Sequence, residues 1–238
     1  MSGRFKLVIQ QVLTRAQWDV HRGVPLAIHR QAVLRRLGNV SLLDVGANEG
    51  LYALAMRDAG YPGQIYSFEP LPDAYQLLAQ RAASDHKWTA ENAACGEAPG
   101  QLSIHRSQNS VSSSLLSMSR THLEAAPTSV YVGPEVPCTV LTLDDYFESK
   151  DQSERFYMKI DVQGFEDRVL RGARRILTRV DALEMEISFT DLYEDQANWN
   201  VMIGGLLDEF ELADIRPGFR AADYRLLQAD VLLLRKGR

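Results

Sequence analysis

Residues 42–50, LLDVGANEG, combine a buried apolar run with a glycine turn. The run ends at Asp44, and Gly46 and Gly50 then bracket three residues, with Glu49 beside the second glycine. A turn of this kind, between the first strand of a parallel sheet and a helix, lets the backbone approach a ligand closely. The stretch therefore predicts a ligand site at the carboxyl end of a strand.

The segments around this turn are typical of a doubly wound α/β sheet. Strands are expected over residues 40–46, 64–70, 88–95, 155–162 and 180–188, and helices over 48–60, 72–83 and 165–177. Strands that alternate with helices in this way form a mostly parallel, Rossmann-like sheet. After a helix over about 197–209, two strands over 210–217 and 229–236 follow each other without a helix between them. This predicts an antiparallel C-terminal strand.

The chain is expected to divide into two parts. Residues 1–38 form an N-terminal extension of two helices, over about 5–20 and 24–37, and residues 39–238 form one α/β domain.

A Ser-rich segment, residues 107–129, lies between strands expected over 101–107 and 137–143. The segment lacks strong periodicity, and loops of this length inside a domain are usually functional or disordered. We expect either a mobile substrate loop or a plain surface excursion.

Composition and charge narrow the classes of function. The 238 residues carry a net charge of −5, which argues against general affinity for nucleic acid. Residues 1–40 hold seven Lys or Arg and one acid, a net of +6, so the other residues together carry −11. Two helices with solvated basic faces explain this asymmetry, and a basic lid over an anionic ligand or a membrane surface is the alternative.

Cysteines and apolar runs suggest the compartment. The two cysteines show no C-x-x-C spacing, which fits a reducing environment. Apolar runs are a few residues long, far short of the roughly 20 that a membrane span requires. We therefore expect a cytoplasmic protein without a transmembrane segment.

The glycine turn, G-x-x-x-G, differs from the dinucleotide fingerprint G-x-G-x-x-G, because with Gly50 aligned to the third glycine, Ala47 stands at the second glycine position. Asp44 and Glu49 add negative charge where a phosphate would be disfavoured. S-adenosylmethionine carries a sulfonium and an ammonium and no phosphate, so it is the better ligand. A nicotinamide-dependent oxidoreductase remains an alternative, as does a non-catalytic module that binds an adenosyl ligand.

Polar residues end the other strands as well. Glu69 lies 19 residues beyond Gly50, where an acid commonly accepts hydrogen bonds from ribose hydroxyls. Lys159 and Asp161 alternate with apolar residues at the end of a later strand, and a charged residue in such a strand needs a partner or a ligand. Glu186 lies near the carboxyl end of the strand that follows.

Together these motifs resemble the FkbM family of S-adenosylmethionine-dependent methyltransferases. The motifs LLDVGANEG, YSFEP, NAACG, SSSLL, LTLD, KIDVQGFEDRVLRGA and LEMEI occur in the family's order and spacing, from about residue 40 to about residue 190. The sequence departs from the family at Gln163, where Glu is usual.

The resemblance implies a class I methyltransferase fold and O-methylation, often of a sugar or polyketide hydroxyl. The residues that would hold the donor are Asp44, Gly46, Asn48 and Gly50 at its methionine end, Glu69 at the ribose, Asn92 to Ala94 at the adenine, and Lys159 and Asp161 near the methyl group. The acceptor would be a small molecule or glycan with a free hydroxyl, and the sequence leaves a homo-oligomer open.

A hydroxyl is a poor nucleophile, so a general base is expected to assist the transfer. Asp161 and Glu186 are the best-placed carboxylates, with His105 and His122 as the histidine candidates. Ser113, Ser114 and His122 are expected on the substrate side.

A divalent metal could activate the hydroxyl instead, with Asp144 and Asp145 as ligands beside Asp161. The stretch LTLDDYF, residues 141–147, reads equally as the capped start of a helix, so we predict no metal.

Overall fold

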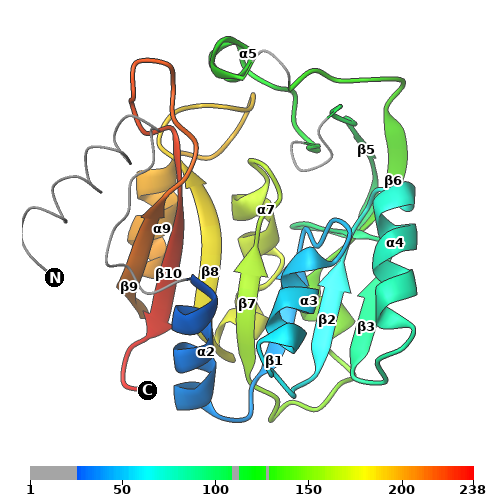
Figure 1. The fold of residues 1–238 in the computed structure, drawn as a ribbon, viewed down its shortest axis with the longest axis vertical. Coiled ribbons are helices and arrows are strands. Elements are labelled where there is room, and N and C mark those ends of the chain that lie inside the picture. Colours follow the sequence, from blue (N-terminus) through cyan, green and yellow to red (C-terminus); the bar gives the residue numbers. More distant parts are fainter. Residues whose placement is uncertain (1–25, 109–112, 127–128) are drawn as a thin grey trace, which may run out of the picture.

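A seven-stranded sheet forms the centre of the protein (Figure 1). This computed structural model describes residues 26–108, 113–126 and 129–238, so the helix expected over 5–20 lies outside the described residues. The strands are ordered β3 (Trp88–Glu91), β2 (Ile65–Phe68), β1 (Ser41–Val45), β7 (Phe156–Ile160), β8 (Val180–Ser188), β10 (Gln228–Arg235) and β9 (Phe210–Pro217). The first five strands in this order, β3, β2, β1, β7 and β8, are parallel to one another, and β10 is antiparallel to both β8 and β9. The predicted fold class is confirmed.

Helices cover both faces of this sheet. Those beside the sheet are α2 (Leu26–Leu37), α3 (Leu51–Asp58), α4 (Pro72–Ala82), α6 (Leu143–Tyr146), α7 (Glu166–Arg171), α8 (Arg174–Leu177) and α9 (Trp199–Leu206), whereas α5 (Arg120–Ala125) lies beyond the carboxyl ends of the strands (Figure 1). Within the described ranges, no helix is both long and apolar enough to cross a membrane.

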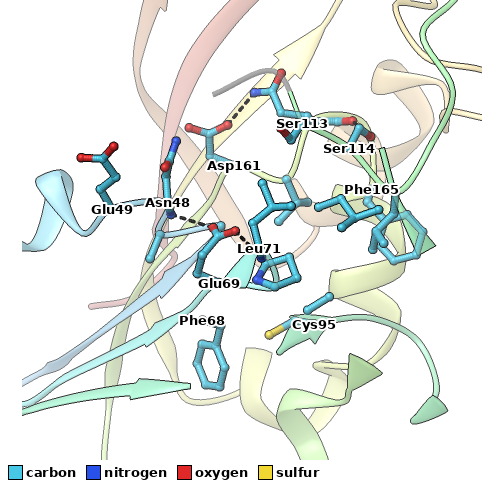
Figure 2. A pocket seen from close by; sticks show the side chains of 18 of the residues that line it. Asn48, Glu49, Phe68, Glu69, Leu71, Cys95, Ser113, Ser114, Asp161 and Phe165 are labelled. Carbon is cyan, nitrogen blue, oxygen red and sulfur yellow. Dashed lines mark hydrogen bonds between the residues drawn. The ribbon is translucent and has the colours of Figure 1, made fainter. Parts of the chain in front are cut away.

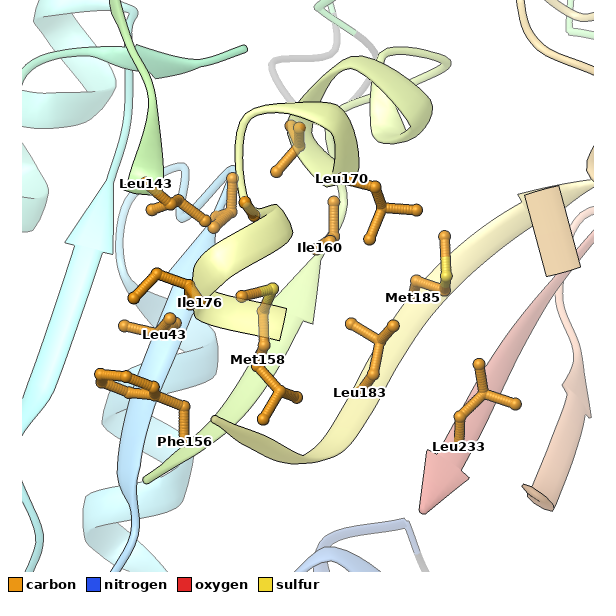
Figure 3. Close-up of a cluster of buried hydrophobic side chains, with 14 of the residues drawn as sticks. Leu43, Leu143, Phe156, Met158, Ile160, Leu170, Ile176, Leu183, Met185 and Leu233 are labelled. Atoms are coloured by element: carbon orange, nitrogen blue, oxygen red, sulfur yellow. The ribbon is translucent and has the colours of Figure 1, made fainter. Parts of the chain in front are cut away.

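Side-chain alternation along the strands divides the core into two layers. Leu43 on β1 packs with Met158 on β7 and Leu183 on β8, beside α6 to α9 (Figure 3). Their neighbours Leu42 and Tyr157 face the opposite layer, with α2, α3 and α4. Since successive side chains of a strand point to opposite faces, continuous apolar strands bury both faces of the sheet.

The segment expected as a single strand over 88–95 is divided. β3 ends at Glu91, and β4 (Ala94–Cys95) instead joins β6 (Val136–Leu141) and β5 (Gly100–Ile104) in a separate three-stranded sheet. The Asn92 side chain donates to the backbone carbonyls of Glu69 and Pro70, at 2.9 and 3.1 Å. These bonds tie the chain to the end of β2 and redirect it out of the main sheet.

The prediction of a single helix over 165–177 is also wrong, because this segment divides into α7 and α8 at Gly172. The Gly172 carbonyl accepts the Asp144 N–H at 3.0 Å, and the Asp144 carboxylate in turn accepts the N–H groups of Arg175 and Ile176. Asp144 therefore caps a new helix start.

The Ser-rich segment contains the short helix α5, which its weak periodicity did not predict. Ser119 caps this helix by accepting the N–H of His122 at 3.3 Å. Residues 109–112 and 127–128 of the segment lie outside the described residues. Its closure over a substrate stays a prediction.

Candidate active site

A pocket of about 270 Å³ opens at the carboxyl ends of β1, β2 and β7 (Figure 2). In a doubly wound sheet, ligands bind at this edge. Its lining comes from the glycine turn, the loop after β2, the Ser-rich segment and the loop after β7. The lining residues include Gly46, Asn48, Glu49, Tyr52, Glu69, Leu71, Ala94, Ser113, Ser114, Lys159, Asp161, Gln163 and Phe165.

The glycine turn is packed tightly against the loop after β7. Gly46 and Gly50 have φ of 78° and 79°, and Asn48 has φ of 48°. A Cβ at Gly46 would lie 1.9 Å from the carbonyl oxygen of Asp161, so only glycine fits there. The turn thereby brings backbone groups to the pocket wall.

Asp44 and Lys159 form a buried ion pair behind this turn. The Lys159 ammonium lies 3.6 Å from Asp44 and 3.3 Å from Asp161, and it donates to the Gly46 carbonyl at 3.3 Å. Burial raises the pKa of Asp44, and the ammonium offsets part of this increase. Burial lowers the pKa of Lys159, but the carboxylates of Asp161 and Asp44 leave it above its usual range. Lys159 lines the pocket and Asp44 lies behind it.

Glu69 occupies the end of β2, between the backbones of Asn48 and Leu71 (Figure 2). Its Oε2 accepts the Asn48 N–H and its Oε1 accepts the Leu71 N–H, both at 2.8 Å. A carboxylate offers about four acceptor positions, so two remain for a ligand. Burial raises the pKa of Glu69 to about 7.

Asp161 and Glu186 are joined by an amide. Nε2 of Gln163 donates to Asp161 at 2.8 Å and to Glu186 at 3.0 Å. Asp161 lines the pocket and is partly exposed, whereas Glu186 is not among the lining residues. Burial, and then the Asp161 carboxylate, raises the pKa of Glu186 well above its usual range. The structure therefore brings both predicted carboxylates together, with only Asp161 facing a ligand.

The other predicted site residues divide into two groups. Ser113, Ser114 and Ala94 line the pocket, but Asn92 and His122 do not. Asn92 is bound to the loop after β2, and the buried His122 packs edge-on against Tyr193 at 5.1 Å between ring centres.

His105, the other histidine candidate, also lies off the pocket lining. Its ring stacks on Tyr131 at 4.8 Å.

The sequence reasoning missed a cluster behind the pocket. Tyr52, on α3, lines the pocket, and its ring contacts the Arg30 guanidinium at 4.5 Å and the Lys159 ammonium at 5.4 Å. Glu184 accepts hydrogen bonds from Arg30, Tyr52 and Tyr157. Glu184 alternates with Glu186 along β8, but nothing local in the sequence indicates a partner 154 residues away.

The two aspartates of the metal alternative lie at the starts of helices. Asp144 caps α8, and Thr142 caps α6 by accepting the Asp145 N–H. Across residues 26–108, 113–126 and 129–238, no group of His, Cys, Asp or Glu side chains is arranged to hold a metal ion.

Comparison with known proteins identifies the family. A model of the methyltransferase FkbM domain matches residues 44–226. The chain belongs to the FkbM methyltransferase family. Among curated proteins, the 2-O-methyltransferase NoeI of Sinorhizobium fredii is 26% identical over 215 residues, covering 87% of this chain and 85% of NoeI.

Solved structures similar to this FkbM domain include an rRNA methylase from Streptococcus thermophilus. It has a TM-score of 0.47 and 11% identity, with 90% of this chain and 98% of that chain covered. Another is Aeropyrum pernix fibrillarin with natively bound S-adenosyl-L-methionine, with a TM-score of 0.44 and 15% identity over 83% of this chain and 66% of that chain.

Family membership makes the chain a methyltransferase with S-adenosylmethionine as its donor, and so decides against the oxidoreductase and non-catalytic alternatives. The pocket fits this donor. The two remaining acceptor positions of Glu69 suit a pair of hydroxyl groups, and Gly46, packed against the Asp161 carbonyl, keeps the backbone of the turn at the pocket wall. Leu71, Ala94 and Phe165 supply apolar walls for a flat ring.

Proposed function

We propose that this FkbM methyltransferase transfers a methyl group to a hydroxyl of a sugar, in a glycoconjugate or a natural product. The observation that carries the proposal is the Asp161 carboxylate. It lines the pocket next to the glycine turn, partly exposed, with Lys159 and Gln163 holding its two oxygens. NoeI, named as a 2-O-methyltransferase, supports oxygen as the methylated atom.

When bound, S-adenosylmethionine supplies a methyl group activated by its sulfonium. In the proposed arrangement, Glu69 accepts hydrogen bonds from the ribose hydroxyls and the turn from Gly46 to Gly50 holds the methionine end. Ala94, beside Leu71, flanks the adenine, while Asn92 acts only by shaping that loop. These assignments leave the wall at Asp161 for the acceptor.

Asp161 then orients the acceptor hydroxyl and takes its proton as the oxygen–carbon bond forms. A positioned base of this kind contributes roughly 10²–10⁴-fold to the rate. Alignment of acceptor and donor contributes further, because orientation removes an entropic cost of about 7–11 kcal/mol at most. Ser113 and Ser114 lie on the same side of the pocket, where they would contact the acceptor.

An acceptor panel tests the proposal. The purified protein is incubated with methyl-labelled donor and neutral oligosaccharides, together with matched 2-deoxy sugars. Mass spectrometry and linkage analysis locate the methyl group. We expect one O-methylated product. If the methyl group is on O2, as the name of NoeI suggests, the 2-deoxy acceptor should give none. Transfer to a nitrogen only, or to none of the hydroxyl acceptors, would contradict the proposal.

A further inference from the structure

The side chain of Gln163 lies between the two carboxylates of the site. Its Nε2 is 2.8 Å from Asp161 Oδ1 and 3.0 Å from Glu186 Oε2. The backbone at this residue has φ of 55°, which is uncommon for a non-glycine residue. An uncommon backbone at a residue that touches both carboxylates indicates that the side chain is held there for function.

The orientation of the Gln163 amide follows from its neighbours. The Tyr193 hydroxyl donates to Oε1 of Gln163 at 2.8 Å. Tyr193 is buried, and a Cβ at Gly164 would meet its ring at 2.8 Å, so the ring is closely packed. A flipped amide would point its carbonyl oxygen at two carboxylates. The NH₂ group therefore faces the acids, and each of its two hydrogens binds one of them.

The two carboxylates bound by this amide have different surroundings. Asp161 also contacts the Lys159 ammonium at 3.3 Å, and its side chain is 39% exposed. Glu186 is paired with no cation among the described residues, and its other partner is the Gln228 amide at 2.7 Å. A proton shared by the pair therefore resides on Glu186, and the negative charge resides on Asp161, which lines the pocket.

Other titratable groups also act on this pair. They are Lys159 on β7, Glu166 on α7 and Asp230 on β10, with Asp44 and Glu184 on the strands beside Lys159, and the Tyr193 hydroxyl. Most are acids. A third carboxylate at position 163 would add to this charge, whereas an amide adds none and supplies two donors.

We infer that Gln163 is a positioning residue of the methyl-transfer site, whose amide holds the two carboxylates together and aims Asp161 at the acceptor hydroxyl, while the surroundings of the pair keep its proton on Glu186. This rests on the proposed function. The hydroxyl proton passes to Asp161 as the new oxygen–methyl bond forms and the bond from sulfur to methyl breaks. Gln163 itself neither gains nor loses a proton or any other group in this step. Its backbone carbonyl also accepts the Ser114 hydroxyl at 2.7 Å, which links the Ser-rich segment to the same residue.

Three variants test the inference. Gln163→Leu keeps the approximate volume and removes both donors. Gln163→Glu keeps the shape and adds a third carboxylate. Gln228→Leu is the matched control, because it removes the other amide from Glu186 without touching Asp161. For each, we would measure kcat, donor KM, the pH profile of kcat/KM, binding of S-adenosylhomocysteine and the carbon-13 titration of the Glu186 carboxyl.

Turnover should fall about 10- to 100-fold in Gln163→Leu and much less in Gln228→Leu, with donor KM and S-adenosylhomocysteine affinity within a few fold. The acid limb of kcat/KM should move up by about one pH unit in Gln163→Glu, since three carboxylates then share one site. The Glu186 titration midpoint should rise in both leucine variants.

The inference and the proposed function can fail separately. A wild-type enzyme that methylates no hydroxyl acceptor contradicts the proposed function, while the Glu186 titration still tests the amide. An unchanged midpoint in Gln163→Leu, or a turnover within twofold of wild type, would overturn the role given to Gln163.

Discussion

Asp44 and Lys159 are register partners on the neighbouring strands β1 and β7, and their side chains form an ion pair of 3.6 Å at the carboxyl end of the sheet. Asp44 is fully buried, and neither of its oxygens accepts a hydrogen bond in the part of the chain that the structure describes. Its charge therefore depends on Lys159. Removing one member of a buried pair leaves the other charge uncompensated.

Lys159→Met should accordingly lower the free energy of unfolding by about 3–5 kcal/mol. The Asp44→Asn, Lys159→Met double variant should lose clearly less than the sum of the two single variants. Urea unfolding of all four proteins gives this coupling. Strictly additive losses would show that the pair is not coupled.

Donor binding should depend on the ionisation of Glu69. Burial raises its pKa to about 7, and the ionised form is the better acceptor for two ribose hydroxyls. S-adenosylhomocysteine, which is what remains of the donor after methyl transfer, carries the same ribose. At pH values below the pKa of Glu69, its binding therefore releases the Glu69 proton, so its affinity should fall as the pH falls. We expect the apparent Kd of S-adenosylhomocysteine to rise roughly tenfold between about pH 8 and pH 6.

Calorimetry with Glu69→Gln tests the source of this dependence. The variant should bind about 1.5–3 kcal/mol more weakly and lose the pH dependence. Glu49→Gln is the matched control, since Glu49 lines the same pocket but pairs with Arg81. A wild-type affinity that is flat from pH 6 to about 8 would exclude Glu69 as the titrating group.

Asp161→Asn separates catalysis from donor binding, because it keeps the shape of the side chain and removes its charge. Turnover should fall at least about 10²-fold, with S-adenosylhomocysteine affinity within a few fold. Glu186→Gln should cost less, since Glu186 lies off the pocket lining. If Asp161→Asn instead binds S-adenosylhomocysteine much more weakly and keeps wild-type turnover at saturating donor, Asp161 belongs to the donor site.

The fold could be predicted because local and global signals agree. The bounds expected for β8 and β9, 180–188 and 210–217, match the structure. Each follows from an apolar or alternating segment with clear ends. The two corrections arise where distant backbone groups compete with the local pattern. Asn92 binds the loop after β2, and Gly172 binds the Asp144 N–H, so one strand and one helix are interrupted.

The candidate site was only partly predictable for the same reason. Acids at strand ends are visible in a sequence, and Glu69 and Asp161 do line the pocket. The partners of those acids are not visible. Gln163 was marked only as a departure from the family, and its contacts with Glu186 and Tyr193 depend on the register of β7 with β8 and on the position of a later loop.

We predict that position 172 requires glycine because of close packing and not because of its backbone conformation. Its φ of −85° suits any residue, but a Cβ there would lie 1.8 Å from the carbonyl oxygen of Gly96. Gly172→Ala must therefore shift α7 away from the loop after β4. We expect a loss of about 1–3 kcal/mol in the free energy of unfolding, as in other overpacked cores.

Gly204 is the matched control for this substitution. It lies within α9, and a Cβ there would meet nothing within 4 Å. Because alanine favours a helix over glycine by up to about 1 kcal/mol, Gly204→Ala should stabilise the protein slightly. Urea unfolding of both variants measures the two effects with the same chemical change. A Gly172→Ala protein as stable as wild type would mean that α7 and the Gly96 backbone do not pack as closely as the structure shows.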